Sequence, residues 1–166
     1  MPGISGSNSR TPEMVDDASR TGLEEHLAGA GLVHVDARVF ALHLTGTGPT
    51  RQTELAFSGI ASGRIKAQTS SLTLYQVLVE VYRQGKPTVA RDVARHMQLY
   101  PRLDIVSASP EIAVQAAEVR AKLGGRPERA LQIATALVSG AEVYLTSGSG
   151  LRRIAGMRVL NVEDAG

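Results

Sequence analysis

Three groups of polar residues each follow an apolar or alternating run and are the first candidates for chemistry. Asp36 comes directly after Leu32–Val35, a hydroxyl run occupies 69–71, and a Thr-Ser-Gly-Ser-Gly run occupies 146–150. Mg²⁺ and Mn²⁺ prefer carboxylates and other hard oxygen ligands, and such an ion can activate water and stabilise charge on an attacked phosphate. A metal site usually takes several converging carboxylates, so Asp36 needs companions from elsewhere in the chain.

The glycine-rich run at 147–150 has a second interpretation as a phosphate cradle. Its glycines allow backbone N–H groups to converge on an anion, and Arg152 and Arg153 follow closely. The run lacks the Walker spacing with its Lys and the dinucleotide-binding spacing, so a flexible turn is the favoured alternative. The chain has no cysteine, which excludes thiolate metal sites, and its four histidines show no metal-ligand spacing.

Hydrophobic periodicity predicts the elements that must position these residues. Apolar or alternating runs predict strands at 32–35, 64–68, 103–106, 142–145 and 157–162. Periodic patterns, caps and breakers predict helices at 22–28, 39–44, 50–61, 88–99, 110–123 and 127–139, with another between the hydroxyls at 69–71 and Gly85. We expect 147–153 to be a loop or a short helix.

Strands separated by helices predict an α/β fold, a three-layer α/β/α sandwich with a parallel sheet of four to five strands. Ligands of such sheets bind in the crevice beyond the carboxyl ends of the strands. Asp36, 69–71 and 146–150 all follow predicted strands, so we expect them to meet at this edge.

The length of 166 residues predicts a single domain. Since 43% of the residues are apolar and only 4% are aromatic, we expect its core to consist mainly of aliphatic side chains. We expect a disordered tail at 1–12, an extension with a short helix at 13–31, the domain at 32–162 and a tail at 163–166. No apolar run is long enough to cross a membrane, and the N-terminus lacks a secretory pattern. We therefore expect a cytoplasmic protein without membrane contact.

The net charge of +2 does not by itself indicate a nucleic-acid binder. Between Arg51 and Arg102, however, six basic residues are opposed by only three acids. These basic residues are Arg64, Lys66, Arg83, Lys86, Arg91 and Arg95. Solvated helix faces are the favoured explanation, and a phosphate-facing surface is the alternative.

Four segments in order resemble the PIN domain family over about residues 32–162. They read VHVDARVF at 33–40, TSSLTLYQVL at 69–78, PERALQIATAL at 127–137 and EVYLTSG at 142–148. PIN domains are small α/β metal-dependent ribonucleases, similar to the toxin ribonucleases of toxin–antitoxin pairs. The resemblance implies a Mg²⁺- or Mn²⁺-dependent endoribonuclease site, an antitoxin-like protein partner and a homodimer.

The sequence departs from the acid pattern that this resemblance implies. Asp36 matches the first acid, but Gln76, Arg129 and Gly148 stand at the other three positions, and Arg38 replaces a small polar residue. An arginine stays charged in proteins and repels a divalent ion. We therefore predict a degenerate site that needs no cofactor, in which Arg38 or Arg129 pairs with Asp36 in place of a metal.

Two functional interpretations follow from the residues and the resemblance. The favoured one is a weak or inactive nuclease, with a cleft that includes Thr146 and Ser147, retained for binding RNA or a protein. Apolar residues around Phe57–Ile60 or Met97–Tyr100 could supply a protein-binding surface, although core packing explains them equally well. The alternative is an active toxin-type ribonuclease whose metal is held by Asp36 with Glu80 and Glu128 as substitute ligands.

Overall fold

The computed structural model of the chain describes residues 17–164, so the tail expected at 1–12 lies outside the described residues. Five parallel strands form one sheet in the order β3-β2-β1-β4-β5. The strands are β1 (Val33–Val35), β2 (Ala67–Ser70), β3 (Leu103–Val106), β4 (Val143–Thr146) and β5 (Arg158–Asn161). The helices are α1 (Asp17–Ala28), α2 (Ala37–Thr45), α3 (Thr50–Ser62), α4 (Ser71–Arg83), α5 (Pro87–Gln98), α6 (Pro110–Leu123) and α7 (Pro127–Val138).

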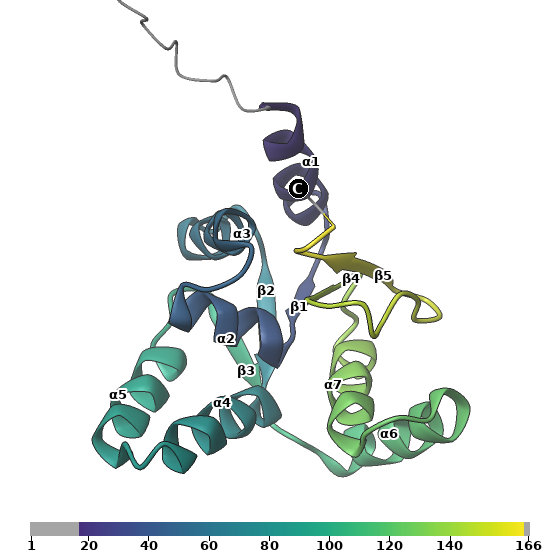
Figure 1. The fold of residues 1–166 in the computed structure, drawn as a ribbon. Coiled ribbons are helices and arrows are strands. Elements are labelled where there is room, and N and C mark those ends of the chain that lie inside the picture. Colours follow the sequence, from purple (N-terminus) through teal and green to yellow (C-terminus); the bar gives the residue numbers. More distant parts are fainter. Residues whose placement is uncertain (1–16, 165–166) are drawn as a thin grey trace, which may run out of the picture.

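Helices cover both faces of this sheet, which confirms the predicted three-layer α/β/α sandwich (Figure 1). Val33 and Val35 of β1 point into a core shared with α1 to α5. On the opposite face, Tyr144 of β4 packs into a second core with α6 and α7. Side chains alternate along a strand, so His34 lies on the same face as Tyr144 and stacks on its ring, with centroids 5.3 Å apart.

The second strand is displaced from its predicted position, because it spans Ala67–Ser70 and not 64–68. Strand β2 lies inside the sheet between β1 and β3, and all four of its residues are buried. Polar residues therefore belong to this strand: Thr69 Oγ1 donates a hydrogen bond to the backbone oxygen of Val35 at 2.7 Å. Only Ser70 of the hydroxyl run caps α4, where its Oγ accepts a hydrogen bond from the N–H of Thr73.

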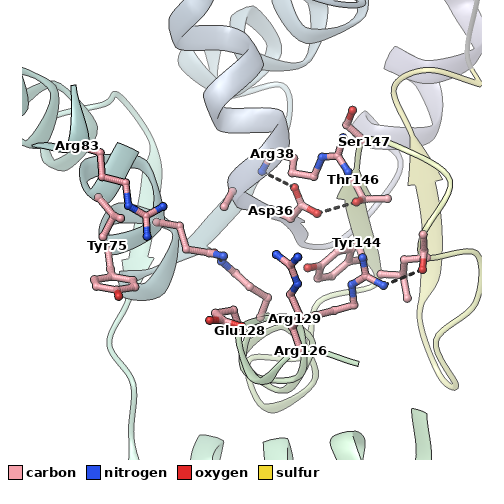
Figure 2. Close-up of a pocket in the computed structure, with 16 residues that line it drawn as sticks. Asp36, Arg38, Tyr75, Arg83, Arg126, Glu128, Arg129, Tyr144, Thr146 and Ser147 are labelled. Carbon is pink, nitrogen blue, oxygen red and sulfur yellow. Dashed lines mark hydrogen bonds between the residues drawn. The ribbon is translucent and has the colours of Figure 1, made fainter. Parts of the chain in front are cut away.

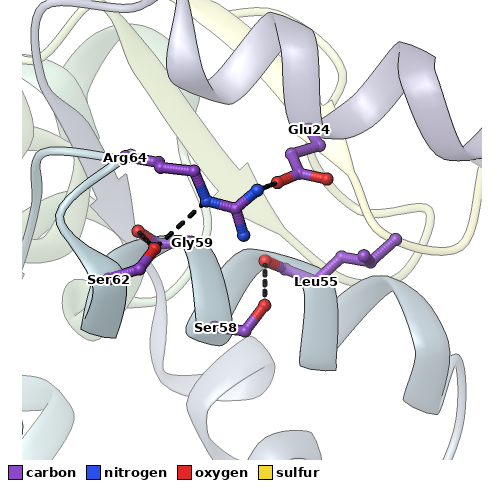
Figure 3. A network of polar contacts seen from close by, with 6 residues as sticks. All are labelled: Glu24, Leu55, Ser58, Gly59, Ser62 and Arg64. Carbon is purple, nitrogen blue, oxygen red and sulfur yellow. Dashed lines mark hydrogen bonds and ion pairs between the residues drawn. The ribbon is translucent and has the colours of Figure 1, made fainter.

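Helix α1 is longer than the predicted 22–28 and packs on the core through Leu23 and Leu27. An ion pair between Glu24 and Arg64 joins α1 to the segment that follows α3 (Figure 3). Arg64 Nε also donates a hydrogen bond to Ser62 Oγ at 3.1 Å, at the end of α3. Arg64, one of the basic residues between Arg51 and Arg102, therefore joins α1 to the end of α3.

The helices proposed as a protein-binding surface instead supply core residues. Phe57, Ile60 and Met97 are buried and Tyr100 is half-buried, whereas Leu99 is 68% exposed. Core packing thus explains the first segment and Met97, but it does not account for the exposed Leu99. The segment 147–153 forms a loop with no helix. Between residues 17 and 164, no helix is long and apolar enough to span a membrane.

Candidate functional site

Asp36 lies between β1 and α2, and both oxygens of its carboxylate bind the protein. Oδ1 accepts hydrogen bonds from the backbone N–H groups of Arg38 at 2.8 Å and Val39 at 3.2 Å, which makes Asp36 the N-cap of α2. Oδ2 accepts a hydrogen bond from Thr146 Oγ1 at 2.6 Å, at the end of the neighbouring strand β4 (Figure 2). The predicted meeting of these two strand ends is therefore observed.

Burial raises the pKa of Asp36, which is only 9% exposed. The hydrogen bonds from Thr146, Val39 and Arg38 lower this pKa in part, and the guanidinium charge of Arg38 is the smallest of the lowering influences. Among residues 17–164, no ion pair joins Asp36 to a guanidinium group, so the predicted direct pairing with Arg38 or Arg129 is not formed. Helix capping and Thr146 stabilise this carboxylate instead.

We expect Asp36→Asn to preserve the fold and Asp36→Ala to destabilise it. Asparagine keeps an oxygen for the N–H groups at the start of α2 and removes a charge that burial disfavours. Alanine removes the cap, which should lower the free energy of unfolding by about 1–2 kcal/mol. Urea denaturation at pH 7 measures both variants. Equal destabilisation of the two would contradict a capping role and show that the negative charge itself is required.

Gln132 of α7 connects the two central strands to α4 through a buried polar network. Its Oε1 accepts hydrogen bonds from His34 Nε2 at 3.0 Å and Ser70 Oγ at 2.9 Å. Its Nε2 donates to Thr73 Oγ1 at 2.7 Å and to Gln76 Oε1 at 3.1 Å. All four hydrogen-bonding positions of this amide are used, so Gln132 is fixed in orientation.

The imidazole of His34 is neutral in this network. Burial lowers the pKa of His34 to about 4, and the hydrogen bond with Gln132 opposes that shift only in part. Since Nε2 donates to Gln132, Nδ1 is left to accept a hydrogen bond from Gln68 Nε2 at 3.4 Å. The network behind the cleft therefore consists of uncharged groups.

A pocket of about 640 Å³ opens beyond the carboxyl ends of the strands, between α4 and α7 (Figure 2). The charged residues that line it are Asp36, Arg38, Arg83, Arg126, Glu128 and Arg129. Four guanidinium groups thus face two carboxylates, one of which is buried and hydrogen-bonded. A pocket with this excess of positive charge favours anions and disfavours a divalent cation.

Two glycines leave room for two of these guanidinium groups. A Cβ atom at Gly148 would lie 2.8 Å from Arg38 Nη1, and one at Gly150 would lie 2.8 Å from Arg129 Nη2. Arg129 Nη1 donates a hydrogen bond to the backbone oxygen of Gly150 at 2.9 Å. The backbone of Gly148 has a φ of 86°, in the left-handed region that favours glycine. The loop at 147–150 therefore accommodates the arginine side chains.

The structure brings most of the predicted site residues together. Gln76 and Arg129 line the pocket with Asp36, and Gly148 lies against Arg38 beside it. Of the two substitute acids, Glu128 lines the pocket, whereas Glu80 does not and is exposed on α4. Thr146 and Ser147 also line the pocket, and Ser147 Oγ donates a hydrogen bond to Glu163 Oε1 at 2.6 Å.

The pocket offers a divalent metal ion a poor set of acidic ligands. No group of three or more Asp, Glu, His or Cys side chains is placed to hold one within the part of the chain that the structure describes. Asp36 already accepts three hydrogen bonds, and Glu128 shares the pocket with four arginines. Hard cations usually bind where several carboxylates converge, and only two carboxylates line this pocket.

Sequence reasoning missed several residues of the pocket. Arg83, Arg126, Tyr75 and Tyr144 line it, and Gln132 orients Gln76. Arg83 belongs to the basic stretch that the sequence singled out, and Arg126 directly precedes the start of α7. The sequence shows both residues as charged, but only the packing of α4 near α7 places them around one pocket.

The sequence model of the PIN domain matches residues 33–157 of the chain. That span includes β1 to β4 and all the residues assigned above to the pocket, while α1 precedes it. No curated protein has a sequence that matches the chain.

Three solved structures illustrate the similarity of fold. VapBC2 from Rickettsia felis, bound to a promoter DNA fragment, has a TM-score of 0.63 and 15% identity, covering 78% of this chain and 98% of the other. A toxin–antitoxin complex from Klebsiella pneumoniae has a TM-score of 0.58 and 18% identity over 78% and 97%. VapC20 from Mycobacterium tuberculosis, described as a sarcin–ricin loop cleaving toxin, has a TM-score of 0.55 and 16% identity over 68% and 86%.

Proposed function

The chain belongs to the PIN domain family, and from that premise we propose that it is a degenerate member, a weak or inactive nuclease that binds RNA through its arginine-lined pocket. The observation that carries this proposal is the charge of the pocket, where Arg38, Arg83, Arg126 and Arg129 surround one buried carboxylate and Glu128. Guanidinium groups bind phosphate oxygens in a bidentate manner and need no metal to do so.

The charges that line this pocket favour binding of an RNA strand over binding of a catalytic metal ion. Phosphate groups supply the negative charge that four arginines require, and binding of this kind weakens as salt rises because counterions are released. The buried network of Gln132, His34 and Gln76 adds no negative charge behind the pocket. Binding without cleavage is therefore the function that these residues support.

The second candidate is a divalent-metal-dependent ribonuclease of the toxin type. Glu128 supports it, because this acid lines the same pocket as Asp36. Glu80 gives it no support, since its carboxylate lies outside the pocket and accepts a hydrogen bond from Gln84. With two carboxylates at most and four arginines, this candidate is the weaker one.

A protein partner of the antitoxin kind is a further part of the proposal. The structures from Klebsiella pneumoniae and Rickettsia felis support it, because the first is described as a toxin–antitoxin complex and the second as VapBC2. Such a complex, or a homodimer, would keep a defined stoichiometry at high salt, whereas RNA binding would not. Light scattering at low and high salt separates these cases.

The proposed function is tested by calorimetric titration of Mg²⁺ and Mn²⁺, with RNA binding measured by fluorescence anisotropy in EDTA. We expect no metal binding, no cleavage of mixed single-stranded RNA, and RNA affinity that falls steeply with salt. Arg83→Gln or Arg126→Gln should weaken binding and reduce the salt slope by about 0.7 each. Arg91→Gln, an exposed change on α5 outside the pocket, is the matched control.

The metal-dependent alternative gives the opposite pattern. Millimolar or tighter Mn²⁺ binding, together with RNA cleavage that Asp36→Asn abolishes, would replace the proposal with an active nuclease. Salt-insensitive binding that the arginine substitutions leave unchanged would show that RNA contacts another surface.

A further inference from the structure

Tyr144 places a hydroxyl at the floor of the pocket. The residue is 2% exposed, and its ring packs on His34 and in the core formed with α6 and α7. Tyr144 also lines the pocket, and its hydroxyl is not among the buried side-chain atoms that lack a partner between residues 17 and 164, so it is open to the pocket. Figure 2 shows this hydroxyl among the arginine side chains. A tyrosine hydroxyl that opens to a pocket from an otherwise buried ring is available to a ligand there.

This hydroxyl acts as a donor. Burial raises the pKa of Tyr144 well above its usual range, the charge of Asp36 raises it further, and Arg129 lowers it only in part. The phenol therefore stays protonated at neutral pH and offers its hydrogen to an anion. A protonated donor between guanidinium groups suits a phosphate oxygen.

The arginines complete the donor set around Tyr144. Arg126 and Arg129 extend from the start of α7 towards the side of the pocket that contains Tyr144 (Figure 2). Arg129 Nη1 is held by the backbone oxygen of Gly150, so that guanidinium is positioned before a ligand arrives. Arg38 adds a third positive charge beside Gly148. A phosphomonoester carries more negative charge than a phosphodiester, so three guanidinium groups and a hydroxyl donor suit it better.

An aromatic ring lies on the α4 wall of the same pocket. Tyr75 is 58% exposed and lines the pocket next to Arg83, across from the arginines of α7 (Figure 2). An exposed ring beside a basic groove is a stacking platform for an unpaired base. The volume of about 640 Å³ lies within the range of small-ligand sites.

We infer that the pocket binds a phosphorylated nucleotide, with its terminal phosphate on Tyr144, Arg126 and Arg129 and its base on Tyr75. This inference rests on the proposed function, because it names the part of RNA that the pocket recognises. The same chemistry is offered by the phosphorylated end of an RNA strand and by a free nucleoside monophosphate.

The test compares four probes in EDTA: adenosine, AMP, and one short RNA with and without a 5′-phosphate. We expect the phosphorylated RNA to bind about tenfold tighter than the unphosphorylated one, because a hydrogen bond to a charged group is lost without it. Binding of AMP but not adenosine would extend the ligand to free nucleotides. Binding of the phosphorylated RNA alone would identify the strand end.

Two substitutions test the two halves of the site. Tyr144→Phe removes only a hydroxyl that opens to the pocket, so the melting temperature should not fall, while the preference for the 5′-phosphate should become smaller because the arginines remain. Tyr75→Ala should weaken binding of both RNAs about tenfold through lost stacking. Tyr82→Ala is the matched control, since Tyr82 is 53% exposed on the same helix but outside the pocket.

The outcomes distinguish this inference from the proposed function. If both RNAs bind equally and Tyr144→Phe changes nothing, while Arg126→Gln still weakens binding, the terminal-phosphate inference is overturned and RNA binding stands. If no probe binds without metal, the proposed function and the inference both fail. If Tyr144→Phe lowers stability, the loss of the phosphate preference in Arg129→Gln and the effect of Tyr75→Ala decide the question.

Discussion

The free energy of unfolding is expected to fall by about 3 kcal/mol between pH 7 and pH 4 because of His34. This side chain is fully buried, and burial lowers its pKa from 6.5 to about 4. The unfolded chain therefore takes up a proton as the pH falls below 6.5, while the folded protein does not until about pH 4. Each unit of pKa shift corresponds to about 1.4 kcal/mol, and the loss at pH 4 is slightly smaller than the full shift gives because His34 of the folded protein is then itself partly protonated.

Two other shifted groups modify this pH dependence. Burial, together with repulsion from His96, lowers the pKa of His43, so this half-buried imidazole adds to the loss of stability in acid. The raised pKa of Asp36 acts in the opposite direction, because its contribution to stability is present at low pH and is lost as the pH rises through its folded pKa. The shift in the pKa of the fully buried His34, from 6.5 to about 4, is the large one among these groups. The loss of stability in acid should therefore dominate.

Urea denaturation at a series of pH values measures the effect. His34→Gln keeps an amide donor and acceptor in the network but does not titrate, so its stability should vary much less between pH 7 and 4. His26→Gln, on an exposed position of α1, is the matched control and should retain the wild-type slope. A wild-type slope that His34→Gln leaves unchanged would show that other groups cause the acid sensitivity.

Most of the fold was predictable from sequence because local patterns and packing agree. The strand at 103–106 and the helix at 110–123 match their predictions, since a Ser-Pro-Glu start and a Gly-Gly end define the helix. The predicted position of strand β2 is wrong because a strand buried on both faces shows no alternation of polar and apolar residues. Polar side chains such as Thr69 can belong to such a strand, since they form hydrogen bonds inside the sheet.

The site was only partly predictable, for a different physical reason. The position of Asp36 at a strand end followed from an apolar run that ends in an acid, and the structure makes it the N-cap of α2. The role of Gln132 had no local pattern, because its four partners lie 56 or more residues away in sequence. Tyr144 likewise looked like an ordinary strand residue until α7 placed arginines around its hydroxyl.

A metal site is expected to return when carboxylates replace the groups that now stand near Asp36. The triple variant Arg38→Asn, Gln76→Glu, Arg129→Asp adds two carboxylates to those of Asp36 and Glu128 in one pocket and removes two guanidinium groups. The carboxylate introduced at position 76 can still accept the hydrogen bond from Gln132 Nε2. We expect calorimetry to detect millimolar or tighter Mn²⁺ binding, where the wild-type protein shows none.

Charge removal alone should not create this site, which a matched variant can test. Arg38→Gln with Arg129→Gln removes the same two positive charges but supplies no new oxygen ligand of carboxylate type. Gly148 is left unchanged in both variants, because its φ of 86° disfavours a side chain. Metal-free RNA affinity should fall in both variants, since both lose two phosphate-binding groups.

If the control binds Mn²⁺ as tightly as the triple variant, the arginines were the only obstacle to a metal, and Asp36 with Glu128 already forms a ligand set. If neither variant binds while both stay folded, the backbone positions around Asp36 no longer converge, and the loss of metal binding lies in the geometry of the cleft as well as in its side chains.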